Sequence, residues 1–70
     1  MSIKKELLSK LSLEDLKRLA SKKGISFSLN ELQKQYYAEW PEKERIVDLM
    51  NDINDLSVRE IEDHLKAIRR

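Results

Sequence analysis

The stretch from Leu11 to Ile25 has the start, apolar stripe and end of a complete helix. Ser12 stands at the expected N-cap, where its hydroxyl can accept a hydrogen bond from an otherwise unpaired backbone N–H of the first turn. Gly24, the only glycine in the chain, suits the left-handed position just past a helix end. The spacing therefore predicts a helix that begins after Ser12 and ends at Gly24.

The side chains of this stretch separate into an apolar face and a basic face. The apolar residues recur with the 3.6-residue period of a helix, at Leu13, Leu16, Leu19 and Ala20. The cations of the other side are Lys17, Arg18, Lys22 and Lys23. Because leucines would anchor the helix from behind, we expect these cations to project together into water.

Two parts of the chain form a pair of related motifs. The first is LSLEDLK followed by GI, within residues 11–25. The second, within residues 41–53, is a lysine followed by an apolar helix, KERIVDLM. Together they resemble the SAP domain, a small helix–extended-loop–helix module that binds nucleic acid. The chain departs from the family pattern between these parts. A longer segment, residues 26–40, replaces the short loop, and Pro41 stands near the position of the family's glycine.

The resemblance implies a non-catalytic DNA-binding accessory module. In SAP domains the basic end of the first helix, the loop and the N-terminus of the second helix contact DNA. The positions that match those contacts here are Lys17, Lys22, Lys23 and Lys43. To these we add other cations of the N-terminal part, namely Arg18, Lys4 and Lys5. Few phosphate contacts imply weak binding with little base specificity, to duplex DNA rather than RNA.

The charge of the chain is unevenly distributed. Residues 1–24 carry seven lysine or arginine residues against three acidic ones, whereas residues 25–70 carry seven against ten. A basic part can meet phosphates while an acidic part cannot, although lysine is also an ordinary surface residue. Charged residues make up 39% of the chain, and such dense, mixed charge is found on thermophile surfaces, so a thermophilic source is a hypothesis.

The rest of the chain predicts further short helices around one core. Residues 1–10 form an amphipathic helix that Ser2 can cap. Ser57 with Glu60 forms a capping box for the last helix, whose apolar stripe suits core packing better than a dimer seam. We therefore expect an all-α fold of four to five short helices, in one domain over residues 1–70 and as a monomer.

The third helix is predicted to begin after Ser28, with Glu31 completing a capping box. Its inner face would be formed by Leu29, Leu32 and Tyr36, and Tyr37 would be the most exposed aromatic residue. Tyr36, Tyr37 and Trp40 form an aromatic cluster that can either stack unpaired bases or anchor the small core. Packing is the favoured interpretation, because a chain of 70 residues needs that buried area.

The fourth helix is predicted to begin at Pro41, because proline suits the first helical position. Its inner face is apolar and consists of Ile46, Val47, Leu49, Met50 and Ile53. Its outer face is acidic and consists of Glu44, Asp48 and Asp52. This acidic face argues against the fourth helix lying along DNA, so only its N-terminal end with Lys43 could approach a phosphate.

Nothing in the sequence suggests an active site. His64 is the only histidine and borders the apolar stripe of the last helix, where a structural role is expected. With one glycine and no cysteine, the chain has no glycine-rich phosphate loop and no cysteine ligands for a metal. We therefore expect no enzyme activity, no cofactor and no bound metal.

The alternative to DNA binding is a protein-interaction or adaptor domain. Its contact surface would be the acidic side of the last two helices, or Tyr37 and Trp40 if these are exposed. No apolar stretch has transmembrane length, so we expect no membrane partner. The expected location is cytoplasmic or nucleoid-associated.

Overall fold

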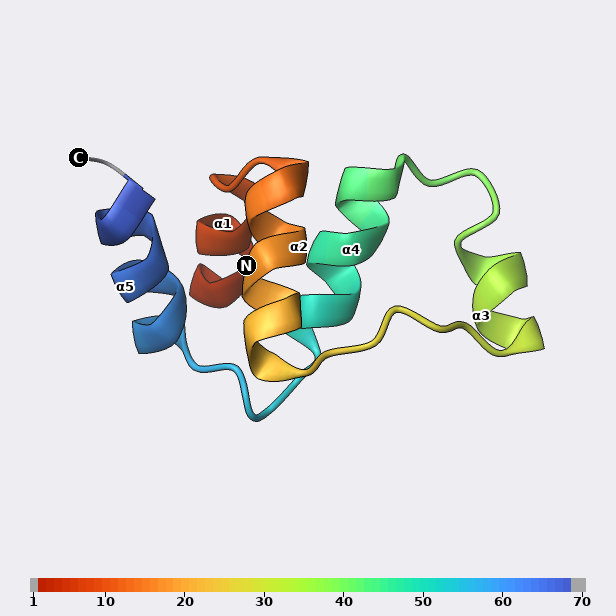
Figure 1. The fold of residues 1–70 in the computed structure, drawn as a ribbon. Coiled ribbons are helices and arrows are strands. Elements are labelled where there is room, and N and C mark those ends of the chain that lie inside the picture. Colours follow the sequence, from red (N-terminus) through yellow and green to blue (C-terminus); the bar gives the residue numbers. More distant parts are fainter. Residues whose placement is uncertain (1, 69–70) are drawn as a thin grey trace.

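The computed structural model describes residues 2–68, and Met1, Arg69 and Arg70 lie outside them. Five α-helices and no strand are found in the described residues, which confirms the all-α prediction (Figure 1). In chain order the helices are α1 (Ile3–Ser9), α2 (Leu13–Lys23), α3 (Glu31–Tyr36), α4 (Glu42–Asn51) and α5 (Val58–Ile68).

Side-chain caps define most of the helix starts. The hydroxyl of Ser2 accepts a hydrogen bond from Lys5 N at 3.3 Å, and that of Ser12 accepts from Asp15 N at 3.2 Å. Ser57 and Glu60 cap each other's backbone N–H at the start of α5, both at 3.2 Å. Each cap satisfies a donor that the first helical turn leaves unpaired. The predicted caps at these three helix starts are confirmed.

The end of α2 also follows the prediction. Gly24 has a φ of 69°, in the left-handed region, which glycine adopts easily because it has no Cβ. The N–H of Ile25 donates to the carbonyl of Ala20 at 2.8 Å, and Ile25 packs partly buried against the core. This backbone turn directs the chain away from α2 into the extended segment before α3.

Four helices surround a single hydrophobic core. Helix α1 packs against α4 and α5, and α2 packs against α4 (Figure 1). Seven large side chains are almost completely inaccessible to solvent: Leu8, Leu11, Leu16, Ile46, Met50, Leu56 and Ile61. In α5 only Ile61 is buried, while Val58 and Leu65 are half-buried and Ile68 is exposed. The stripe of α5 therefore covers one edge of the core.

Helix α3 lies at one end of the molecule, beyond α4, and contributes no residue to the core cluster (Figure 1). Its start differs from the prediction. Asn30, and not Ser28, is the N-cap, and its partner in the capping box is Gln33. Asn30 Oδ1 accepts from Gln33 N at 2.8 Å, and Gln33 Oε1 accepts from Asn30 N at 3.1 Å. Asparagine caps as well as serine does, and Ser28 is instead paired with Ser26 in a local turn.

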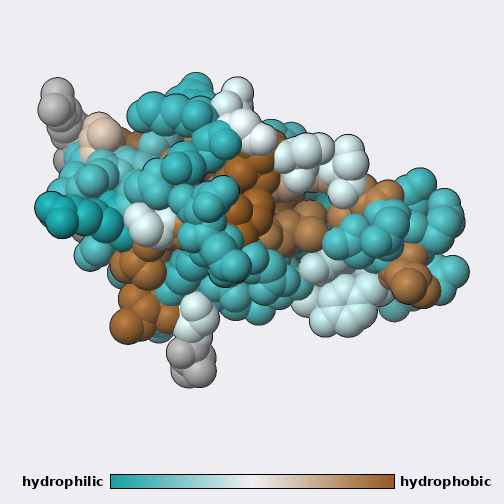
Figure 2. All heavy atoms as spheres, turned by 90° about the horizontal axis from the view of Figure 1, so that it is seen from below, coloured by the Kyte–Doolittle hydropathy of each residue, from teal (hydrophilic) through white to brown (hydrophobic). Residues whose placement is uncertain are grey.

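The inner face of α3 was also predicted wrongly. Leu32 is 77% exposed and Tyr36 is 64% exposed, whereas Tyr37 is only 8% exposed. The face that carries Leu32 and Tyr36 points away from the core, whereas the phenol of Tyr37 has a polar partner on α4. Hydrophobic residues consequently reach the surface at the α3 end of the molecule (Figure 2).

Helix α4 departs from the prediction at two positions. Pro41 is the N-cap and not the first helical residue, with extended backbone angles and no side-chain hydrogen bond to the helix. Asp48 does not face solvent, because its carboxylate is half-buried between α1 and the residue that follows α3. The apolar face is confirmed, with Ile46, Val47 and Met50 buried.

Candidate nucleic-acid interface

Three cations project from the outer side of α2. The side chain of Lys17 is 53% exposed and that of Arg18 is 73% exposed. Lys22, one turn after Arg18, is exposed as well. Behind them the inner side of α2 is held by the buried Leu16 and Leu19. We call Lys17, Arg18 and Lys22 the α2 basic face. The exposure of these cations, with buried leucines on the inner side of the helix, agrees with the amphipathic pattern of the sequence.

Carboxylates lie close to this face. Lys17 Nζ is 3.8 Å from Glu42 Oε2, and Arg18 Nη1 is 3.7 Å from Asp15 Oδ1. Lys22 has no ion pair within residues 2–68. Exposed ion pairs of this length contribute about 0–1 kcal/mol, so a phosphate can replace either carboxylate at little cost. The same carboxylates reduce the positive potential that would attract a polyanion.

Lys23 points to a different neighbour. Its Nζ lies 2.6 Å from Glu60 Oε2, which joins the last turn of α2 to the first turn of α5. The hydrogen bond from Lys23, followed by that from the Ser57 N–H, holds the pKa of Glu60 below its usual value. In this structure Lys23 therefore serves as a link between helices, and it lines the same hollow as Lys22 of the α2 basic face.

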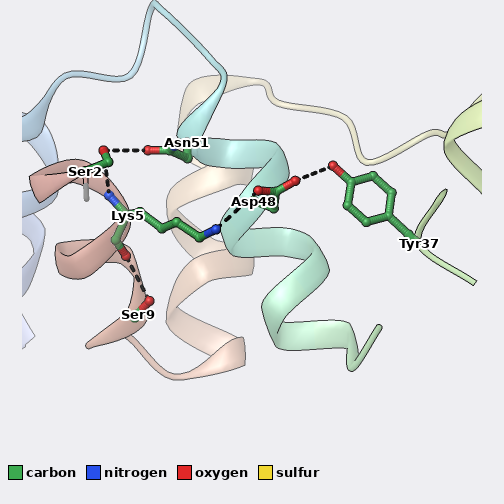
Figure 3. A network of polar contacts seen from close by, with 6 residues as sticks. All are labelled: Ser2, Lys5, Ser9, Tyr37, Asp48 and Asn51. Atoms are coloured by element: carbon green, nitrogen blue, oxygen red, sulfur yellow. Dashed lines mark hydrogen bonds and ion pairs between the residues drawn. The ribbon is translucent and has the colours of Figure 1, made fainter. Parts of the chain in front are cut away.

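The other three predicted site residues link α1 with the α4 region. Lys4 Nζ donates to the carbonyl of Ile53, just after α4. Lys43 Nζ donates to the carbonyl of Ser9 at 3.1 Å. Lys5 Nζ forms an ion pair with Asp48 Oδ1 at 3.4 Å (Figure 3). Each of these lysines is therefore engaged in a contact between α1 and the α4 region.

A polar network connects α1, α4 and the end of α3 (Figure 3). Tyr37 Oη donates to Asp48 Oδ2 at 2.6 Å, and the other oxygen of Asp48 faces Lys5. The hydrogen bond to the carboxylate, followed by burial, raises the pKa of Tyr37 to about 12. Sequence reasoning missed this network, because residues 37 and 48 belong to different elements and no helical spacing relates them.

Two hollows lie beside the predicted site residues. One, of 490 Å³, lies between α1 and the start of α4, with walls that include Lys5, Trp40 and Lys43. The other, of 270 Å³, lies between α2 and α5 and includes Lys22 and His64. The buried Nε2 of His64 has no hydrogen-bond partner within residues 2–68.

No group of three or more potential metal ligands occurs within residues 2–68. Among the same residues, no helix has the length and apolar character needed to cross a lipid bilayer. Comparisons with protein-family models, with curated proteins and with solved structures found no match for this chain. The candidate interface is therefore argued from its own residues.

Proposed function

We propose that the chain is a non-catalytic module that binds the phosphate backbone of duplex DNA weakly, through the α2 basic face. The observation that carries the proposal is that Lys17, Arg18 and Lys22 are all exposed on α2. The buried Leu16 and Leu19 fix the helix from behind, so the cations stand on a rigid element. Side chains that contact phosphates position a protein on DNA but read no sequence.

The number of cations sets the expected salt dependence. Each neutralised phosphate of B-DNA contributes about −0.9 to the slope of log K against log salt, so three contacts give about −2.7. Raising the salt from about 50 to about 200 mM should then weaken binding about 40-fold. A slope near zero would show that any association does not use phosphate contacts.

The experiment is a fluorescence-anisotropy titration of a labelled duplex of about 20 base pairs at these two salt concentrations. The double variant R18E/K22E reverses two charges of the α2 basic face and should abolish binding. The matched control is R59E/K66E, which makes the same charge change at two exposed positions of α5. Equal losses in both variants would mean that net charge alone attracts the DNA, and this would contradict a specific face. Absence of binding by the unaltered chain at low salt would also reject the proposal.

A second candidate function is a protein-interaction module that uses α3. Leu32 and Tyr36 are four residues apart on α3, both exposed, and apolar contact area of this kind favours a protein partner over a phosphate. Amide-shift mapping with a short duplex separates the two candidates. Shifts that cluster within residues 13–26 support DNA binding, and the absence of shifts there leaves the α3 surface as the stronger candidate.

A further inference from the structure

The 490 Å³ hollow between α1 and α4 has the size of a small-ligand site, since such clefts measure about 300–1,000 Å³. Its walls come from α1, from the residue before Pro41 and from the first two turns of α4. The residues that line it are Lys5, Ser9, Trp40, Lys43, Glu44 and Val47. It shares no residue with the α2 basic face.

The hollow has an aromatic wall that is fixed from behind. Trp40 meets Tyr37 edge to face, with ring centroids 5.0 Å apart and an interplanar angle of 87°. It also lies against Tyr36 at 5.5 Å in a tilted arrangement. Trp40 remains half-exposed and lines the hollow, and the nearly buried Val47 adds apolar surface beside it. A held indole of this kind offers a surface on which a flat aromatic base can stack.

The hollow also has two ammonium groups, supplied by different helices. Lys5 comes from α1 and Lys43 from α4. Their present partners are Asp48 at 3.4 Å and the Ser9 carbonyl at 3.1 Å, both in exposed settings. Exposed contacts of this kind are weak, so a dianionic phosphate can compete for both lysines. Glu44 is the one carboxylate among the lining residues, and it opposes an anion.

We propose that this hollow binds a single unpaired nucleotide, with the base stacked on Trp40 and the phosphate between Lys5 and Lys43. The inference goes beyond the proposed function, because duplex DNA offers no free base face along its length. The shared chemistry is an aromatic base joined to a phosphate. A free mononucleotide and the end of a single strand both carry it, and the experiment separates these sources.

Trp40 reports on the site directly, because it is the only tryptophan in the chain. The whole chain is titrated with thymidine 5′-monophosphate and with a short oligothymidylate while the Trp40 fluorescence is followed. Thymidine and inorganic phosphate, at matched ionic strength, each supply only half of the recognised chemistry. Both nucleotide probes should quench the fluorescence, and the two half-ligands should do so far more weakly. If the oligothymidylate alone quenches, the source is a strand; if the mononucleotide quenches equally well per site, a free nucleotide suffices.

Two variants shift the affinity in opposite directions. K43Q removes one phosphate contact and should weaken binding, whereas E44Q removes the opposing carboxylate and should tighten it. K34Q is the matched control, since Lys34 is exposed on α3 and does not line the hollow. Neutralising the one phosphate of a single-stranded ligand gives a salt slope of about −0.7, or about a 2.6-fold loss between about 50 and about 200 mM salt. Circular dichroism checks that each variant is folded.

The outcomes also separate this inference from the proposed function. Quenching that persists in R18E/K22E, while duplex binding is lost, supports two independent sites. Duplex binding without any nucleotide-dependent quenching overturns the inference alone. Quenching that K43Q and E44Q leave unchanged also overturns it, because the ligand would then not lie in this hollow.

Discussion

The substitution Tyr37→Phe tests whether a single hydrogen bond holds the α3 end of the molecule to the core. It removes one hydroxyl and leaves the ring that packs against Tyr36 and Trp40. The lost contact is the 2.6 Å hydrogen bond to Asp48, and hydrogen bonds to charged groups contribute about 1.5–3 kcal/mol. Because Asp48 keeps Lys5 as a partner, we expect the lower end, a loss of about 1.5 kcal/mol in the free energy of unfolding.

For a domain of this size, 1 kcal/mol corresponds to about 4–8 °C in melting temperature, so Y37F should melt about 6–12 °C lower than the unaltered chain. Thermal unfolding at pH 7, followed by circular dichroism, measures this difference. The matched control is Y36F, which removes the hydroxyl of a tyrosine that is 64% exposed and should change the melting temperature very little. A Y37F melting temperature within the error of the unaltered chain, or an equal loss in Y36F, would refute the reasoning.

The same hydrogen bond predicts a pH dependence. The pKa of Tyr37 is raised from 10.0 to about 12, so the folded state favours the neutral phenol. The stabilisation is complete below the unfolded pKa of 10.0 and is lost as the pH rises through about 12. The stability advantage of the unaltered chain over Y37F should therefore shrink between these values, as unfolding at pH 8 and at higher pH would show. A constant advantage would argue against a tyrosine–carboxylate bond.

Substitutions at three further positions test other features of the fold. Leu8 is completely buried, so L8A should cost about 2–5 kcal/mol of unfolding free energy in urea titrations, and a loss below about 1 kcal/mol would contradict its place in the core. Gly24 has a φ of 69° but open space where a Cβ would stand, so G24A should cost about 1 kcal/mol through backbone strain alone, and G24N should cost less. The pKa of Glu60 is lowered mainly by Lys23, so its stabilisation is present above the unfolded value of 4.5 and is lost as the pH falls through the folded one. E60Q should therefore reduce the acid sensitivity of unfolding, and an unchanged pH profile would show that the Lys23 pair does not contribute.

Predictions from the sequence were correct for features that depend only on residues close together in the chain. The Ser12 cap, the left-handed Gly24 and the Ser57–Glu60 capping box were all predictable, because each involves positions at most three residues from a helix end. The apolar face of α4 was predictable for the same reason, since it depends only on helical periodicity. These local signals were sufficient to give the all-α class with four to five short helices.

The errors occurred where two local signals competed or where a distant partner decided the outcome. Both Ser28 and Asn30 are followed three residues later by a suitable capping partner, and the choice between them decided where α3 begins. Tyr37 and Asp48 were assigned to solvent because their periodicity gave no hint that they bond to each other. The lysines of the candidate site illustrate the same limit. Sequence shows that a lysine is present, but only packing shows that Lys4, Lys5 and Lys43 reach across to neighbouring elements.

Because α3 lies outside the core, amino-acid substitutions on its surface need not alter the packing of the other helices. The packing of α1, α2, α4 and α5 excludes the residues of α3 itself, and α2 and α4 already touch each other without it. Substitutions on its outer surface leave the buried leucines and isoleucines undisturbed. A lineage carrying this fold can thus acquire new surface chemistry on α3 while the four-helix framework stays intact.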